Sequence, residues 1–200
     1  MDIIDQVIFW ISTKPQYAGY IIFFVSLAES LAVIGIIIPG VIILFGVGAL
    51  IGSGVLNFWE IYVWALSGAI IGDAVSYHLG RFFDPSISKL KWFRQHPEYL
   101  KNGYDFFEKW GDLSIVIGRF FGPVRAIIPF VAGLMKMSVN RFYLANVISA
   151  FAWALAYLIP GILFGKSSGI NNLGTWLIIL LALFIVVGLL LFIKRYLSST

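Results

Sequence analysis

The sequence predicts an all-α, multi-span membrane protein in which two inverted re-entrant (broken-helix) hairpins lie among transmembrane helices. Of its 200 residues, 60% are hydrophobic and only 12% are charged, which is about half the charge of a typical soluble domain. Several uncharged stretches exceed the roughly 20 residues that a helix needs to cross a bilayer. Two further apolar stretches carry isolated charges and prolines, a pattern typical of broken helices.

The N-terminal part holds the first predicted hairpin. Met1–Trp10 contains two aspartates and no basic cluster, so it does not resemble a cleavable signal peptide. Residues 15–57 contain a single charge, Glu29. As one helix this stretch would be about twice as long as a bilayer is thick. It must therefore fold back, and Pro39-Gly40 is the predicted turn.

A long span and a polar segment follow. Residues 58–83 form the first predicted full span, although Glu60, Asp73 and Arg81 interrupt its apolar character. Residues 84–112 combine basic and aromatic side chains, which predicts an amphipathic loop on the cytoplasmic face. An ordinary soluble loop is the alternative.

The second predicted hairpin covers residues 113–140. Its two legs are too short for two full crossings, and Pro129 is the predicted break, with Pro123 as a second helix-disrupting position. Residues 142–165 and 167–193 are uncharged spans that run outward and back, and the basic residues after them favour a cytoplasmic C-terminus. The first hairpin then enters from outside and the second from inside.

The two hairpins share a spacing that suggests an inverted repeat. Glu29 precedes Pro39 by ten residues, and Arg119 precedes Pro129 by ten. Each of these prolines follows two isoleucines. Similarity together with opposite entry sides is the pattern of inverted transporter repeats. Chance similarity between two apolar segments is the alternative.

Four ionisable residues at membrane depth are the candidate functional residues: Glu29, Asp73, Arg119 and Arg125. Charges inside a bilayer are costly, so they face partners, cavities or substrates. Two arginines brought together by a helix break suit a phosphate, which guanidinium binds with forked geometry. The two carboxylates are interpreted as proton sites or as counter-charges. Purely structural ion pairs are the alternative.

Other residues receive structural roles or are set aside. Gly68, Gly72 and Gly80 recur at helical spacing and predict a close-packing face. His78 and His96 are no metal pair, because neither has a second ligand three or four residues away, and the chain has no cysteine. We expect no metal, no cofactor and no nucleic-acid partner. The sequence also lacks the nucleophile–base set of a hydrolase, so no enzyme is expected.

Three motifs resemble those of the DedA family, also called VTT or SNARE-associated membrane proteins. They are F-V-S-L-A-E-S with I-P-G in Phe24–Gly40, G-D-A-V-S-Y-H-L-G-R in Gly72–Arg81, and G-R-F-F-G-P-V-R-A-I-I-P-F-V-A-G in Gly118–Gly133. The resemblance covers residues 19–165. It implies a multi-pass protein of the bacterial inner membrane that acts as a lipid flippase.

The resemblance also implies a substrate class and its site. The expected partner is a polyprenyl phosphate, undecaprenyl phosphate, or a membrane phospholipid such as phosphatidylethanolamine. Family function residues are matched by Glu29, Arg119 and Arg125. Several relatives carry an acidic residue where this chain has Val41, so a proton site here would have fewer carboxylates than in those relatives. A proton-coupled transporter of a small ion or solute is the alternative function, and a homo-oligomer is left open.

Overall fold

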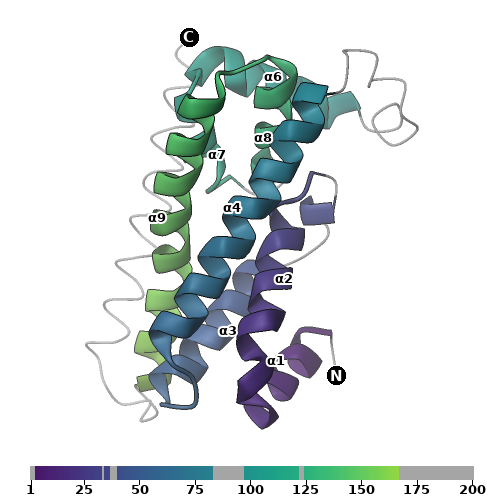
Figure 1. The fold of residues 1–200 in the computed structure, drawn as a ribbon. Helices are drawn as coiled ribbons and strands as arrows, with labels where there is room; N and C mark the ends of the chain where they lie inside the picture. Colours follow the sequence, from purple (N-terminus) through teal and green to yellow (C-terminus); the bar gives the residue numbers. More distant parts are fainter. Residues whose placement is uncertain (1–2, 33, 37–39, 83–96, 122–123, 167–200) are drawn as a thin grey trace.

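The structure is a computed structural model that describes residues 3–32, 34–36, 40–82, 97–121 and 124–166, and every element in these residues is a helix (Figure 1). The elements are α1 (Ile3–Thr13), η1 (Pro15–Tyr17), α2 (Ala18–Ser30), η2 (Ile34–Ile36), α3 (Gly40–Gly52), α4 (Phe58–Phe82), α6 (Pro97–Trp110), α7 (Leu113–Gly118), α8 (Val124–Leu134) and α9 (Val139–Lys166). The predicted all-α class is confirmed. The predicted span 167–193, Pro39, Pro123 and His96 lie outside the described residues.

Among the described residues, two helices, α4 and α9, are long and apolar enough to cross a membrane. They contain 25 and 28 residues, so each exceeds the ~30 Å of a hydrocarbon core at about 1.5 Å per residue. Each also exposes apolar side chains along its length: Val63, Ile71, Val75 and Leu79 on α4, and Leu144, Ile148, Phe151 and Ile159 on α9. Such an apolar surface suits contact with lipid.

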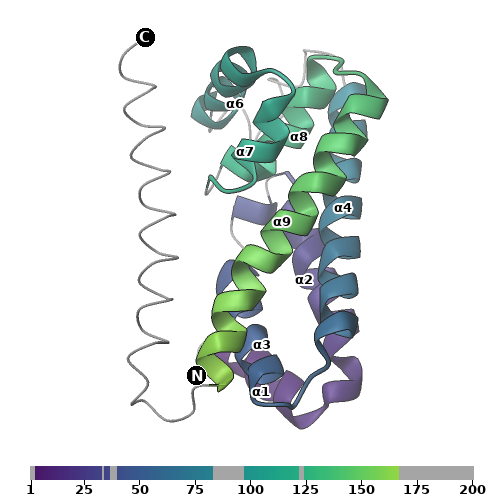
Figure 2. The same cartoon turned by 90° about the vertical axis from the view of Figure 1, so that its left-hand side faces the viewer.

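The short helices occupy the two ends of the molecule. In Figures 1 and 2, α1, α2 and α3 lie at one end of α4 and α9, and α6, α7 and α8 lie at the other end. α2 and α3 have 13 residues each, α7 has 6 and α8 has 11. None of these four reaches the ~20 residues of a full crossing. The end of α2 and the start of α8 meet near the middle of α4 (Figure 1).

Glycines permit the closest helix contacts. A Cβ at Gly68 or Gly72 of α4 would collide with the backbone of α2, and a Cβ at Gly80 would collide with the backbone of α8. Gly48 of α3 and Gly161 of α9 face each other in the same way. The glycine face predicted on α4 therefore meets two different helices, one from each end of the molecule. This is the small-residue packing typical of membrane helices.

The polar segment contains one described helix, α6. It buries Leu100 and partly buries Tyr104 and Phe107 against Ile127 and Val131 of α8. Its opposite face carries exposed polar side chains: Lys101, Asn102, Asp105 and Glu108. α6 is therefore amphipathic, with its apolar face covered by protein along α8.

The helix break in residues 113–140 differs from the prediction. α7 ends at Gly118 and α8 begins at Val124, whereas Pro129 lies inside α8. The prediction of a break at Pro129 is therefore wrong. A proline there removes one backbone hydrogen bond, to the carbonyl of Arg125, close to the helix start. The sequence Gly-Pro at 122–123 disrupts a helix more strongly, because the residue before proline avoids the helical conformation.

Candidate functional site

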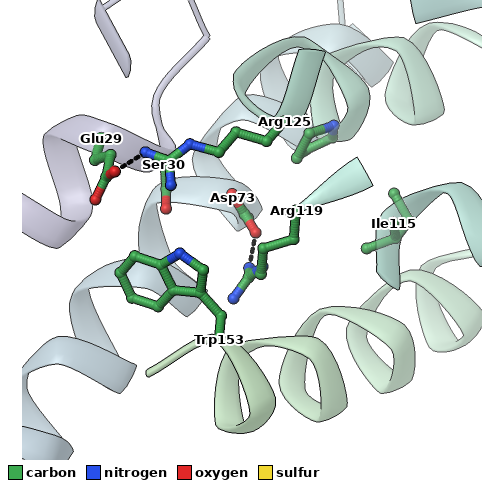
Figure 3. Close-up of a pocket in the computed structure, with 8 residues that line it drawn as sticks. Glu29, Ser30, Asp73, Ile115, Arg119, Arg125 and Trp153 are labelled. Carbon is green, nitrogen blue, oxygen red and sulfur yellow. Dashed lines mark hydrogen bonds and ion pairs between the residues drawn. The ribbon is translucent and has the colours of Figure 1, made fainter. Parts of the chain in front are cut away.

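A small cavity lies where α2, α4, α8 and α9 meet the end of α7 (Figure 3). Its lining residues are Glu29, Ser30, Asp73, Ile115, Arg119, Arg125, Pro129 and Trp153. All four ionisable residues singled out in the sequence thus reach one site. The space open to a water-sized sphere is about 10 Å³, roughly what one water molecule requires. The site is therefore closed to anything as large as a phosphate.

Arg119 occupies the C-cap of α7 and pairs with Asp73 of α4. Both side chains are about 6% exposed. Nη2 of Arg119 also donates to Oδ1 of Asn146 at 2.6 Å, and Nδ2 of Asn146 donates to the carbonyl of Ile70 at 3.1 Å. Asn146 is fully buried. It therefore fixes one edge of the guanidinium against the backbone of α4.

Arg125, in the first turn of α8, pairs with Glu29 in the last turn of α2. Glu29 is 1% exposed and Arg125 is 12% exposed. A Cβ at Gly40 would collide with the Glu29 carboxylate, so glycine leaves the space that this carboxylate fills at the start of α3. A helix N-terminus favours a negative charge. The guanidinium of Arg125 also lies 6.0 Å from the ring centroid of Trp153.

The four charges sum to zero, with two guanidiniums balancing two carboxylates. Each pair joins elements that are distant in the sequence, α7 to α4 and α8 to α2. Buried charges persist only when they are paired and hydrogen-bonded. Glu29 and Asp73 therefore lie in the counter-charge position that the sequence predicted as one of their two roles. The proton-carrying role stays a prediction.

Two further lining or supporting residues, Asn146 and Trp153, are not identified by the sequence analysis. Both lie on α9, inside a span that carries no charge between residues 142 and 165. Their signals are weak but real. An amide inside a transmembrane helix usually has a hydrogen-bond partner, and a tryptophan far from both helix ends departs from the usual interfacial position.

The remaining polar residues of α4 point to other contacts. The Tyr77 hydroxyl donates to the carbonyl of Met137 at 2.5 Å, and Arg81 donates to the same carbonyl at 2.8 Å. His78 contacts the Tyr143 hydroxyl at 3.0 Å on the surface. No group of three or more metal-ligating side chains occurs among the described residues.

Comparison with known proteins identifies the family. Residues 38–163 match the VTT domain. The chain is 32% identical to the inner membrane protein YabI of Escherichia coli over 90% of this chain and 72% of that protein. It is 37% identical to protein DedA of E. coli over 72% of this chain and 68% of that protein. No solved structure matches the chain.

These similarities also bear on localisation. YabI and YqjA of E. coli are both named inner membrane proteins, and YqjA is 28% identical over 77% of this chain and 72% of that protein. The predicted inner-membrane localisation is confirmed. The VTT domain covers more than half of the 200 residues, and the motifs that suggested the family fall within or beside it. The chain is a membrane protein of the DedA family, whose members carry the VTT domain.

Proposed function

We propose that this protein moves a phosphate-bearing lipid, a polyprenyl phosphate or a phospholipid such as phosphatidylethanolamine, between the leaflets of the membrane. The observation that carries the proposal is the convergence of Arg119, which is buried, and Arg125, which is 12% exposed, on one cavity midway along α4 and α9. Forked guanidiniums suit phosphate oxygens. Both come from the segment around a helix break, where transporters place their substrate sites.

The ion pairs suggest how a phosphate could enter a closed, neutral site. Asp73 and Glu29 hold the positions that anionic oxygens would take in a complex. A phosphate that replaces a carboxylate keeps each arginine paired, so the arginine is not left bare in a medium of low dielectric. The displaced carboxylate then needs a proton or a new partner, which would account for a coupling role of Glu29. The phosphate of the transported headgroup would thus replace a carboxylate of the protein as the partner of an arginine.

An apolar groove supports a lipid over a small solute. It has a volume of about 700 Å³ and lies along α4 beside Tyr143 of α9. Ile70, which lines this groove, accepts the hydrogen bond of Asn146, and Asn146 in turn holds Arg119. The groove is therefore one side chain away from the cavity. A hydrocarbon tail in the groove would place its headgroup beside the arginines while the tail stays in lipid.

The proposal is tested with purified protein in vesicles that contain a polyprenyl phosphate, phosphatidylethanolamine or an uncharged polyprenol. Arg119→Lys and Arg125→Lys keep the charge but remove the fork. We expect each to slow movement of the phosphate-bearing lipid about ten-fold or more, the effect of losing one hydrogen bond to a charged group. Arg141→Lys is the matched control, because Arg141 is exposed.

Full transport by both lysine variants would contradict the phosphate clamp. Wild-type protein that moves none of these lipids, but carries a small solute down a proton gradient, would favour the alternative function of a proton-coupled solute transporter. Equal movement of the polyprenol and its phosphate would show that the headgroup is not recognised.

A further inference from the structure

We infer that Trp153 binds a phosphoryl oxygen of the lipid headgroup through its indole N–H, together with Arg119; this rests on the function proposed above. The cavity holds two buried donors that have no hydrogen-bond partner among the described residues, Nη1 of Arg119 and Nε1 of Trp153. Arg119 is 7% exposed and Trp153 is 2% exposed. Both side chains are thus shielded from solvent while retaining a donor that could serve a ligand.

Unpaired buried donors call for an explanation, because each has lost its hydrogen bond to water without a compensating bond in the protein. For Arg119, the other terminal nitrogen is already held by Asp73 and Asn146. This fixes the guanidinium so that Nη1 is the free edge, on the side toward Trp153 (Figure 3). The arrangement keeps one donor available while the ion pair is intact.

The indole contributes a donor without a charge. Trp153 comes from α9, across the cavity from the arginines of α7 and α8, and its ring already lies 6.0 Å from the guanidinium carbon of Arg125. A phosphate has several acceptor oxygens, so it can accept from the indole and from both guanidiniums at once. An indole N–H can only donate, which selects an anionic or carbonyl oxygen and excludes an ammonium group from that position.

The test uses the full chain in lipid nanodiscs, labelled with 5-fluorotryptophan at its seven tryptophans. Trp153→Phe keeps an aromatic ring, removes the N–H and assigns the Trp153 resonance in the fluorine NMR spectrum. Trp64→Phe is the control, since Trp64 packs against Tyr20 and Phe23 outside the cavity. The probes are farnesyl phosphate, a short-chain phosphatidylethanolamine and farnesol, which lacks phosphate.

We expect farnesyl phosphate, the phosphatidylethanolamine or both to shift the Trp153 resonance, whereas farnesol does not and the Trp64 resonance stays in place. In calorimetry, the phosphate probe should bind Trp153→Phe with an affinity about ten-fold lower than that of the wild type, or lower still. It should bind Trp64→Phe with the affinity of the wild type. The probe that produces the shift identifies which of the two phosphate sources the site takes.

A Trp153 that is not a ligand and a site that binds no phosphate give different results in this test. If a phosphate probe binds the wild type but the Trp153 resonance is unchanged and Trp153→Phe binds equally well, Trp153 is not a ligand and the arginine site stands. If neither phosphate probe binds the wild type, the proposed function is contradicted as well. If Trp153→Phe fails to fold, a Trp153→Tyr variant assigns the Trp153 resonance instead. The presence or absence of a shift of that resonance on adding the phosphate probe then decides whether Trp153 is a ligand.

Discussion

Asp73→Asn should destabilise the protein strongly, because it strands the Arg119 charge in the interior. The Arg119–Asp73 side chains are about 6% exposed, and breaking a buried pair from one side typically costs about 3–5 kcal/mol. The hydrogen bond from Arg119 to Asn146 persists in the variant but provides no counter-charge. With about 2–4 °C of melting temperature per kcal/mol for a chain of this size, the expected drop is about 6 °C or more.

The chain offers a matched control for this substitution. Asp112 pairs with Arg141 at 3.3 Å, but these side chains are 46% and 74% exposed, so Asp112→Asn should change stability by only about 0–1 kcal/mol. Thermal unfolding of both variants in the same detergent compares the same chemical change at a buried and an exposed pair. Removing both buried charges, with Asp73→Asn and Arg119→Gln together, should recover part of the loss. Equal melting temperatures for Asp73→Asn and Asp112→Asn would refute the reasoning.

Three other predictions concern packing, topology and coupling. Gly72→Ala should lower the free energy of unfolding by about 1–3 kcal/mol, because the added Cβ meets the backbone of α2. Gly46→Ala should lower it less, because the Cβ there meets only the flexible end of a side chain. Equal melting temperatures for the two variants would contradict this. In intact cells, an impermeant thiol reagent should label Ser53→Cys and not Asn102→Cys, and the reverse pattern would invert the topology. Glu29→Gln should lower the melting temperature by stranding Arg125, and unchanged stability with unchanged transport from about pH 5.5 to 8.5 would exclude both roles of Glu29.

The sequence could predict the charged part of the site because the bilayer makes charges conspicuous. Glu29, Asp73, Arg119 and Arg125 each interrupt an apolar stretch of the sequence. A charge is costly inside a bilayer, and this cost makes the four residues conspicuous and also favours their pairing within the protein. Their pairing could not be predicted in the same way. Whether Glu29 meets Arg119 or Arg125 depends on how α8 approaches α2, and this is a tertiary property that no local pattern encodes.

Neutral residues of the site escaped prediction for the opposite reason. Asn146 and Trp153 lie in a span without charges, where one amide and one indole are weak signals, so their place in the site emerges only from the packing of α9 against the other helices. Pro129 failed as a marker of the break because a single proline is compatible with a helix whose neighbours compensate. The sequence of two isoleucines and a proline therefore lies inside a helix in the second hairpin segment. The matching proline of the first segment, Pro39, lies outside the described residues.

The charge balance of the site has a consequence for how a lipid could cross. The Glu29–Arg125 pair joins α2 from one end of the molecule to α8 from the other, and Asp73–Arg119 joins α4 to α7. In the proposed function, a phosphate that pairs with Arg125 would release Glu29, and with it the ion pair that links α2 to α8. Binding of the headgroup and the contact between the two groups of short helices would then oppose each other. A ligand shifts a conformational equilibrium by the difference between its affinities for the two conformations. Under the proposed function, a site that is neutral and closed when empty would open on binding an anion without leaving a bare charge in the membrane.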